Sequence, residues 1–304
     1  MTCDILCIGE PLYELNQQPD GRFTPGFGGD TSNVAVAAAR LGAHAAYVSL
    51  VGNDMFADAL FGLWRREGVD ATHVSRLEHA PTGLYFIIHG PSGHDFTYRR
   101  AGSAATFLTP GHIPDEAIAS AKFLHVSAIS QAISTSAADA VSRAIDVARS
   151  KGNSVSYDTN LRLRLWPLER ARATIEATAR HADILKTSQD DAEALIGFRD
   201  PDTIARYFAG LGARTVIVTM GAAGGFILSG GIHQMIEGFP VEAIDASGAG
   251  DAFTGALLSE LVTGRDLAEA CRFAAAAAAL STTGYGAVAP LPDRAAVETF
   301  LRSR

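Results

Sequence analysis

The sequence predicts an α/β protein with a mostly parallel central sheet covered by helices, and a small antiparallel sheet beside it. Short β-rich runs alternate with helical patterns along most of the 304 residues. Such alternation is typical of parallel strands joined by helices. Two stretches, approximately residues 11–27 and 83–100, break the alternation because they lack a helical period. Strands without intervening helices predict a second, antiparallel sheet.

The elements of the main sheet follow from local patterns. Residues 5–9 and 46–51 are expected to be strands. Residues 31–42 read as a helix with an alanine face, and residues 55–67 as a helix that ends before Gly68. Further strands are expected at residues 123–126, 154–157, 183–185 and 215–219, each after a helical pattern.

The two exceptional stretches have their own signals. Residues 84–89 and 95–100 read as strands around the turn Gly90-Pro91-Ser92-Gly93. Residues 11–27 contain glycines and prolines without a helical period. No linker of disordered composition and no internal repeat interrupts the chain, so residues 1–304 are expected to form one domain.

Composition excludes several classes of partner. The chain is 47% hydrophobic, with a net charge of −8, and this acidic balance argues against nucleic acid. Cys3, Cys7 and Cys271 fit neither a zinc site nor a redox pair, so buried thiols in a reducing cytoplasm are expected. The first residues lack the features of a signal peptide, and the alanine-rich run 273–280 is too short to span a membrane. We therefore expect a cytoplasmic protein without membrane partners.

The most informative run is 245–256, where Gly248, Ala249 and Gly250 precede an apolar-periodic helix. A glycine-rich turn that opens a helix directs unpaired N–H groups and the helix dipole at one point, which suits a phosphate. Asp251 next to this point suits a base that takes the proton of an attacking hydroxyl. The alternative is an aspartate that only stabilises the helix dipole, but the length of the whole run favours catalysis.

A second glycine turn, in residues 27–35, also opens a helix. Its glycines let a ligand approach the backbone, while Asp30 or Thr31 can cap the helix. Capping alone is the alternative interpretation.

These two runs, one near each end of the chain, resemble the signatures of the ribokinase-like (phosphofructokinase-B type) sugar kinases. The resemblance implies a ribokinase-like three-layer fold in which residues 11–27 and 83–100 form a lid over the sugar. It implies that Asp251 is the catalytic base and that the backbone of residues 248–250 holds the charge on the transferred phosphoryl group. The residues that match the sugar-binding turn are Gly28, Gly29, Asp30 and Asn33.

The lid carries a candidate carboxylate site. Tyr98 and Arg100 lie two apart on an expected strand and share a face, whereas Arg99 points the other way. The guanidinium of Arg100 suits a carboxylate, and Tyr85 on the partner strand offers a hydroxyl or an aromatic wall. An arginine that only keeps an edge strand soluble is the alternative. Residues 98–105 and the form Gly-Gly-Asp-Thr at residues 28–31 resemble 2-keto-3-deoxygluconate kinases. The resemblance implies that Tyr85, Tyr98 and Arg100 bind the acid group of the substrate.

Further candidates follow the ends of expected strands, where parallel sheets bind ligands. Asp158, Asn160 and Arg162 form one such group, and Arg164 is expected to be solvated. The resemblance places Arg162 near both substrate and phosphates, and Asn160 near the nucleotide.

Ser188 and Asp191 form another group. They occupy the two places of an Asn-x-x-Glu motif that in the family orders Mg²⁺, largely through water, although neither residue is identical to the motif. Oxygen ligands suit Mg²⁺, but the same residues also suit a helix N-cap followed by an acidic first turn. The resemblance implies that the nucleotide also contacts Thr219, Gly221, Gly224, Gly248 and Gly250, beside Ser188.

We therefore expect an ATP- and Mg²⁺-dependent kinase that converts 2-keto-3-deoxygluconate to its 6-phosphate. A monovalent cation (K⁺) near Asp245 and a homo-oligomer are expected by resemblance. The alternatives are a fructokinase, ribokinase or nucleoside kinase of the same family, or, in a different class, a non-catalytic sugar sensor. Asp251 beside an anion site argues against the sensor, since binding alone needs no base. A dinucleotide-binding dehydrogenase is excluded because residues 26–31 lack the final glycine of its motif.

Overall fold

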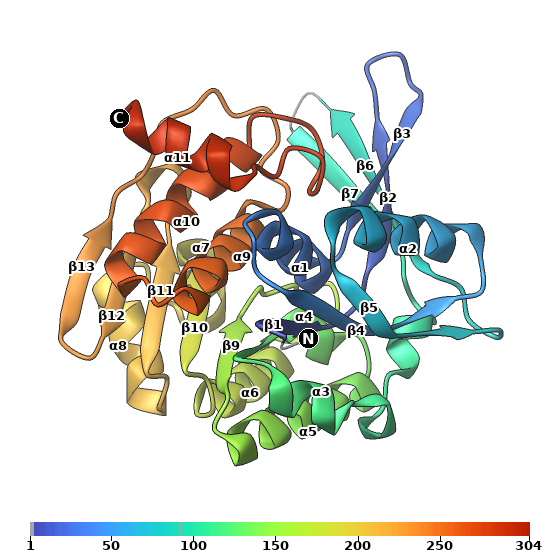
Figure 1. Ribbon diagram of the computed structural model, residues 1–304, viewed down its shortest axis with the longest axis horizontal. Coiled ribbons are helices and arrows are strands. Elements are labelled where there is room, and N and C mark those ends of the chain that lie inside the picture. The colour runs from blue at the N-terminus through green and yellow to red at the C-terminus, as the bar shows by residue number, and fades with distance from the viewer. Residues whose placement is uncertain (1–2, 91–92) are drawn as a thin grey trace.

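The computed structural model describes residues 3–90 and 93–304, and in this part of the chain a nine-stranded sheet lies between two layers of helices (Figure 1). The strand order is β13-β12-β11-β10-β9-β8-β1-β4-β5, and all neighbours from β11 to β5 pair in parallel. The predicted three-layer fold is therefore confirmed. The parallel strands are β1 (Ile5–Ile8), β4 (Ala45–Gly52), β5 (Asp70–Leu77), β8 (Phe123–Ser127), β9 (Ser154–Asp158), β10 (Ile184–Ser188) and β11 (Thr215–Thr219).

Each face of the sheet has its own hydrophobic core, because side chains along a strand alternate between the two faces. In β1, Ile5 and Cys7 pack on one face, while Leu6 and Ile8 pack on the other. The first face is covered by α1 (Asp30–Arg40), α2 (Met55–Glu67), α9 (Ala249–Val262), α10 (Leu267–Ser281) and α11 (Arg294–Arg302). The second is covered by α3 (Asp115–Ser120), α4 (Ala128–Ala132), α5 (Thr135–Lys151), α6 (Leu168–Ala179), α7 (Gln189–Ile196) and α8 (Pro201–Leu211).

A four-stranded sheet projects from one end of the main sheet and corresponds to the expected lid (Figure 1). Its order is β3-β2-β6-β7, with a parallel β2–β6 pair between two antiparallel pairs. Its strands are β2 (Leu12–Gln17), β3 (Phe23–Gly28), β6 (Gly83–Gly90) and β7 (Gly93–Arg99). Arg100 lies one residue beyond β7, and Pro91 and Ser92 of the expected turn are outside the described residues.

Three strands were not expected from the sequence. They are β5, β12 (Gly225–Ser229) and β13 (Ile232–Ile236), of which β12 and β13 form an antiparallel hairpin at the edge of the sheet. The edge strands β5 and β13 expose at least half of their side chains, so their sequences lack the apolar runs of the central strands. The alanine-rich run 273–280 lies inside α10 and packs on the first face.

The three cysteines are free thiols. Cys7 and Cys271 are buried as expected, whereas Cys3 is half-buried. Among the described residues, no helix combines the length and the hydropathy that crossing a membrane requires.

Helices α1 and α9 cross closely at Gly255, and this crossing positions the N-terminal ends of both helices. A Cβ at Gly255 would lie 2.6 Å from the Cβ of Ala37 and 2.8 Å from the carbonyl oxygen of Val34. Such separations are impossible for a real side chain, so only glycine permits this approach. Both helices begin beside the lid, and their first turns therefore meet there.

We predict that Gly255→Ala lowers the free energy of unfolding by about 1–3 kcal/mol, the usual cost of overpacking a dense core. Gly210 in α8 is the matched control, because it is exposed and a Cβ there meets nothing within 4 Å. Gly210→Ala should raise the free energy of unfolding by about 0.5 kcal/mol through helix propensity. Urea denaturation measures both, and a stabilising Gly255→Ala substitution would refute the crossing constraint.

Candidate active site

A cavity of about 800 Å³ lies between the lid, the carboxyl ends of the central strands and the first turns of α1 and α9. Most of the residues selected from the sequence line it. They are Gly29, Asp30, Asn33, Tyr85, Tyr98, Arg100, Asn160, Arg162, Ser188, Asp191, Thr219, Gly221, Gly248, Ala249, Gly250 and Asp251.

Gly28 and Gly224 do not line this cavity, in contrast to the prediction. A Cβ at Gly28 would lie 2.4 Å from the hydroxyl oxygen of Tyr85, so this glycine makes room for that ring. Gly224 has a positive φ of 91°, and a Cβ there would lie 2.1 Å from the carbonyl oxygen of Ile236. Both positions require glycine for packing.

Asp251 occupies the first turn of α9 and is only 8% exposed. Its Oδ2 accepts a hydrogen bond of 2.8 Å from Nδ2 of Asn33, so the base is oriented by a residue of α1. Burial, followed by the negative charges of Asp30 and Asp158, raises the pKa of Asp251 to about 8. A carboxylate with such a raised pKa is well suited to accept a proton near neutral pH.

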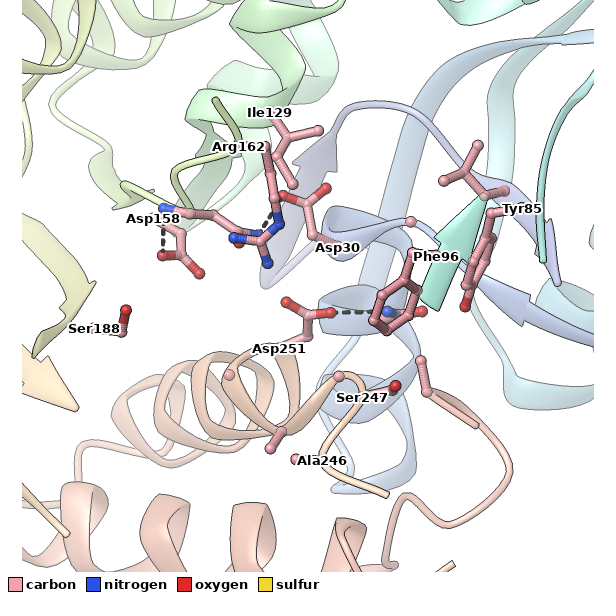
Figure 2. A pocket seen from close by; sticks show the side chains of 18 of the residues that line it. Asp30, Tyr85, Phe96, Ile129, Asp158, Arg162, Ser188, Ala246, Ser247 and Asp251 are labelled. Atoms are coloured by element: carbon pink, nitrogen blue, oxygen red, sulfur yellow. Dashed lines mark hydrogen bonds between the residues drawn. The ribbon is translucent and has the colours of Figure 1, made fainter. Parts of the chain in front are cut away.

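The turn before Asp251 has the geometry of an anion site. Gly248 is the N-cap of α9 in the left-handed conformation, with φ of 74°. The following backbone N–H groups of Gly250 and Asp251 donate to no acceptor among the described residues. Figure 2 shows Asp251 at the start of α9, pointing into the cavity toward Asp30 and Arg162. The site thus combines free N–H groups, the positive end of a helix and a base.

Asp30 connects the start of α1 to the residues that follow β9. Its Oδ2 accepts a hydrogen bond of 3.0 Å from Nδ2 of Asn160, and its Oδ1 accepts one of 2.9 Å from the backbone of Thr31. The expectation that Asp30 or Thr31 caps α1 is wrong, because the N-cap is Gly29 and no side chain caps the helix. Asn160 has a positive φ of 26°, an uncommon backbone state that occurs often at functional sites.

The lid contributes an aromatic wall. Tyr85 stacks on Tyr98 with ring centroids 5.8 Å apart, and Phe96 stacks beside both. The hydroxyl of Tyr85 donates a hydrogen bond to Glu14 inside the lid. Figure 2 shows Tyr85 and Phe96 on the side of the cavity opposite Asp158.

Arg100 faces the cavity from the end of β7, with its side chain 11% exposed. It forms an ion pair with Glu10, which also accepts a hydrogen bond of 2.7 Å from the hydroxyl of Ser103. Its buried Nε donates to no partner in the described part of the chain. The arginine is therefore part of the cavity wall rather than a solvated edge residue.

The group around Asp191 has the helix N-cap that its sequence suggests. Ser188 caps α7, since its hydroxyl accepts a hydrogen bond of 3.0 Å from the backbone of Asp191. Asp191 accepts a hydrogen bond from the backbone of Leu161 and lies 3.8 Å from Nη1 of Arg162. No cluster of three metal-ligating side chains occurs among the described residues. A single carboxylate facing the cavity nevertheless suits Mg²⁺, which keeps several waters and binds substrate phosphates.

Several cavity residues were not selected from the sequence. Glu10 lies two residues after the end of β1, so the rule of strand ends could have found it. Phe96 and Ile129 give no polar signal. Arg164 was expected to be solvated; it is exposed, but its Nη1 also donates a hydrogen bond of 3.0 Å to the carbonyl of Phe96 in the lid.

Residues 3–294 match the family model described as "pfkB family carbohydrate kinase". The chain is 35% identical to "Fructokinase-2" of Solanum habrochaites, over 98% of this chain and 96% of that protein. It is 32% identical to "2-dehydro-3-deoxygluconokinase" of Thermoproteus tenax, over 98% of this chain and 94% of that protein. Curated relatives thus include kinases of a neutral ketose and of a keto sugar acid.

Solved structures agree with this assignment. The crystal structure of a putative ribokinase II from E. coli in complex with ATP and Mg²⁺ superposes with a TM-score of 0.91 and 26% sequence identity. The match covers 99% of this chain and 100% of the other. The chain therefore belongs to the pfkB family of carbohydrate kinases and is a phosphotransferase that acts on an alcohol group.

Proposed function

We propose that this kinase transfers the terminal phosphoryl group of ATP to the primary 6-hydroxyl of 2-keto-3-deoxygluconate. The observation that carries the choice of an acid is Arg100, a buried arginine in the cavity wall whose Nε has no partner among the described residues. A carboxylate suits an arginine, because the charge-assisted hydrogen bonds between them are stronger than neutral ones. Tyr98 stands beside it, with the guanidinium carbon 5.5 Å from the ring centroid.

A fructokinase activity is the second candidate, and a specific contact favours it. Glu10 already neutralises the charge of Arg100, which lowers the demand for an anionic substrate. A relative at 35% identity is also named a fructokinase. The choice between the two therefore depends on whether Arg100 contacts a substrate carboxylate.

The proposed reaction begins when the lid holds the sugar with its 6-hydroxyl beside Asp251. The Asp251 carboxylate takes the hydroxyl proton as the oxygen forms a bond to the terminal phosphorus and the bond to the ADP oxygen breaks. The free N–H groups of Gly250 and Asp251 stabilise the charge on the transferred group. Asn33 keeps the base oriented, and the lid excludes water so that ATP is not hydrolysed.

Nucleotide and metal are proposed to bind at the ends of β10 and β11. Ser188, Thr219 and Gly221 line this side of the cavity. Mg²⁺, with Asp191 as its protein carboxylate, would neutralise phosphate charge. The buried Asp245 accepts backbone hydrogen bonds of 2.9 Å from both Ser247 and Gly286, and K⁺ near it is part of this proposal.

Asp251→Asn should lower kcat by at least ~10²-fold, because the amide cannot accept the hydroxyl proton. Its melting temperature and nucleotide affinity should stay near the wild-type values, since the substitution keeps the shape of the side chain. A coupled assay of ADP release measures turnover. Wild-type turnover in this variant would show that Asp251 is not the base.

The activity should depend on pH through the same group. Because the carboxylate is the active form and its pKa in the free protein is raised to about 8, kcat/KM should fall as the pH drops below about 8. Asp30→Asn removes a negative charge that raises this pKa, so the midpoint should move to lower pH. An unchanged midpoint in Asp30→Asn would contradict the electrostatic account of Asp251.

Arg100→Ala should raise KM for 2-keto-3-deoxygluconate about 10-fold or more, the effect of losing a charge-assisted hydrogen bond. KM for fructose should change less. Arg99→Ala is the matched control, because the neighbouring arginine is exposed and does not line the cavity. Steady-state kinetics on both sugars measures these KM values. Equal changes in KM for the acid and the neutral sugar would favour the fructokinase.

A further inference from the structure

Lys186 is a buried lysine in the cavity wall that the proposed mechanism does not use. It lies on β10 and its side chain is 7% exposed. The register of the sheet places it beside Asp158 of β9, and its Nζ lies 2.8 Å from Oδ2 of that residue. A lysine buried in a binding cavity is costly unless its charge has a function or a full set of partners.

The ammonium group reaches the turn at the start of α9. A Cβ placed on Gly250 would lie 3.3 Å from Nζ of Lys186. The ammonium therefore lies beside Gly250, in the first turn of α9, where a side chain would crowd it. An ammonium carries three N–H donors, and Asp158 is the single ion-pair partner of Lys186 in the part of the chain that the structure describes.

Several negative charges surround Lys186, and its positive charge can offset them. Asp158, Asp191 and Asp251 all line the same cavity, and the phosphates of a nucleotide would add further negative charge. Burial lowers the pKa of Lys186, but the negative charge of Asp158 outweighs it and holds the pKa above its usual value. The side chain is therefore a permanent cation beside the anion site.

We propose that Lys186 binds the terminal phosphate of the nucleotide and holds it over Gly250 during transfer. This inference rests on the ATP-dependent transfer proposed above. One N–H of the ammonium remains on Asp158, which orients the side chain, while the others donate to phosphate oxygens. Lys186 thus supplies a fixed positive charge on the side of the phosphoryl group that faces the sheet, and it favours a triphosphate over a diphosphate.

The alternative is that Lys186 only neutralises Asp158 in the folded protein. Nucleotide selectivity separates the two roles, because neutralising Asp158 has no preference for a third phosphate. We would measure the affinities of Mg²⁺-bound AMP-PNP and ADP by calorimetry for wild type and Lys186→Met. The proposal predicts a loss of at least ~10-fold for AMP-PNP and less than ~3-fold for ADP.

A second variant keeps the test valid if Lys186→Met alone does not fold. Lys186→Met combined with Asp158→Asn removes both buried charges, a change that buried ion pairs often tolerate. The comparison is with Asp158→Asn alone, and the selective loss for AMP-PNP should persist. Lys122→Met is the matched control, because Lys122 forms a 2.9 Å ion pair with Asp4, and neither residue lines the cavity.

The outcomes are distinct from those for the proposed function. Equal losses for AMP-PNP and ADP, recovery of AMP-PNP affinity in the double variant, or a change confined to KM for the sugar would each overturn the role of Lys186. Wild-type protein without turnover on any sugar would instead overturn the proposed function. The binding comparison still tests Lys186 in that case, since it needs no acceptor sugar.

Discussion

The close crossing of α1 and α9 at Gly255 is the constraint on which the site depends. Both helices start at the cavity, so the contact between them sets the distance between the glycine turn before α1 and the base in α9. The hydrogen bond of 2.8 Å from Asn33 to Asp251 is the direct result. A dense core permits only small changes in such a crossing, and the two signature runs at opposite ends of the chain can therefore act as one unit.

The charges of the buried aspartates and their partners then determine the chemistry of the site. Asp30, Asp158 and Asp251 are all buried near one another, and each would be costly without polar partners. The structure supplies Asn160 to the first and Lys186 to the second. Asp251 accepts a hydrogen bond from the amide of Asn33, but burial and the negative charges of Asp30 and Asp158 outweigh it and raise the pKa of Asp251 to about 8. The raised pKa suits Asp251 to accept a proton near neutral pH, and Lys186 places a positive charge in the wall of the same cavity.

The sequence predicts the parts of this site that depend on local pattern. The glycine turns, Asp251 and the residues after β9 and β10 were found because strand ends and helix starts have recognisable signals. The partner of Arg100 was not found, since Glu10 lies far away in sequence and only the packing of the lid brings the two together. The edge strands β5 and β13 were missed for a related reason, because their exposed residues carry no apolar pattern.

The pairing of Arg100 with Glu10 also limits how selective the site can be. An arginine has five N–H donors, so it can bind a substrate carboxylate while it keeps Glu10. The negative charge of Glu10 nevertheless repels a carboxylate and lowers the gain from an acid substrate. Selectivity is a difference between two affinities, and here the attraction of one arginine is set against the repulsion of one buried glutamate. The ion pair with Glu10, which also accepts a hydrogen bond from Ser103, therefore sets the local charge against which a carboxylate substrate would have to bind.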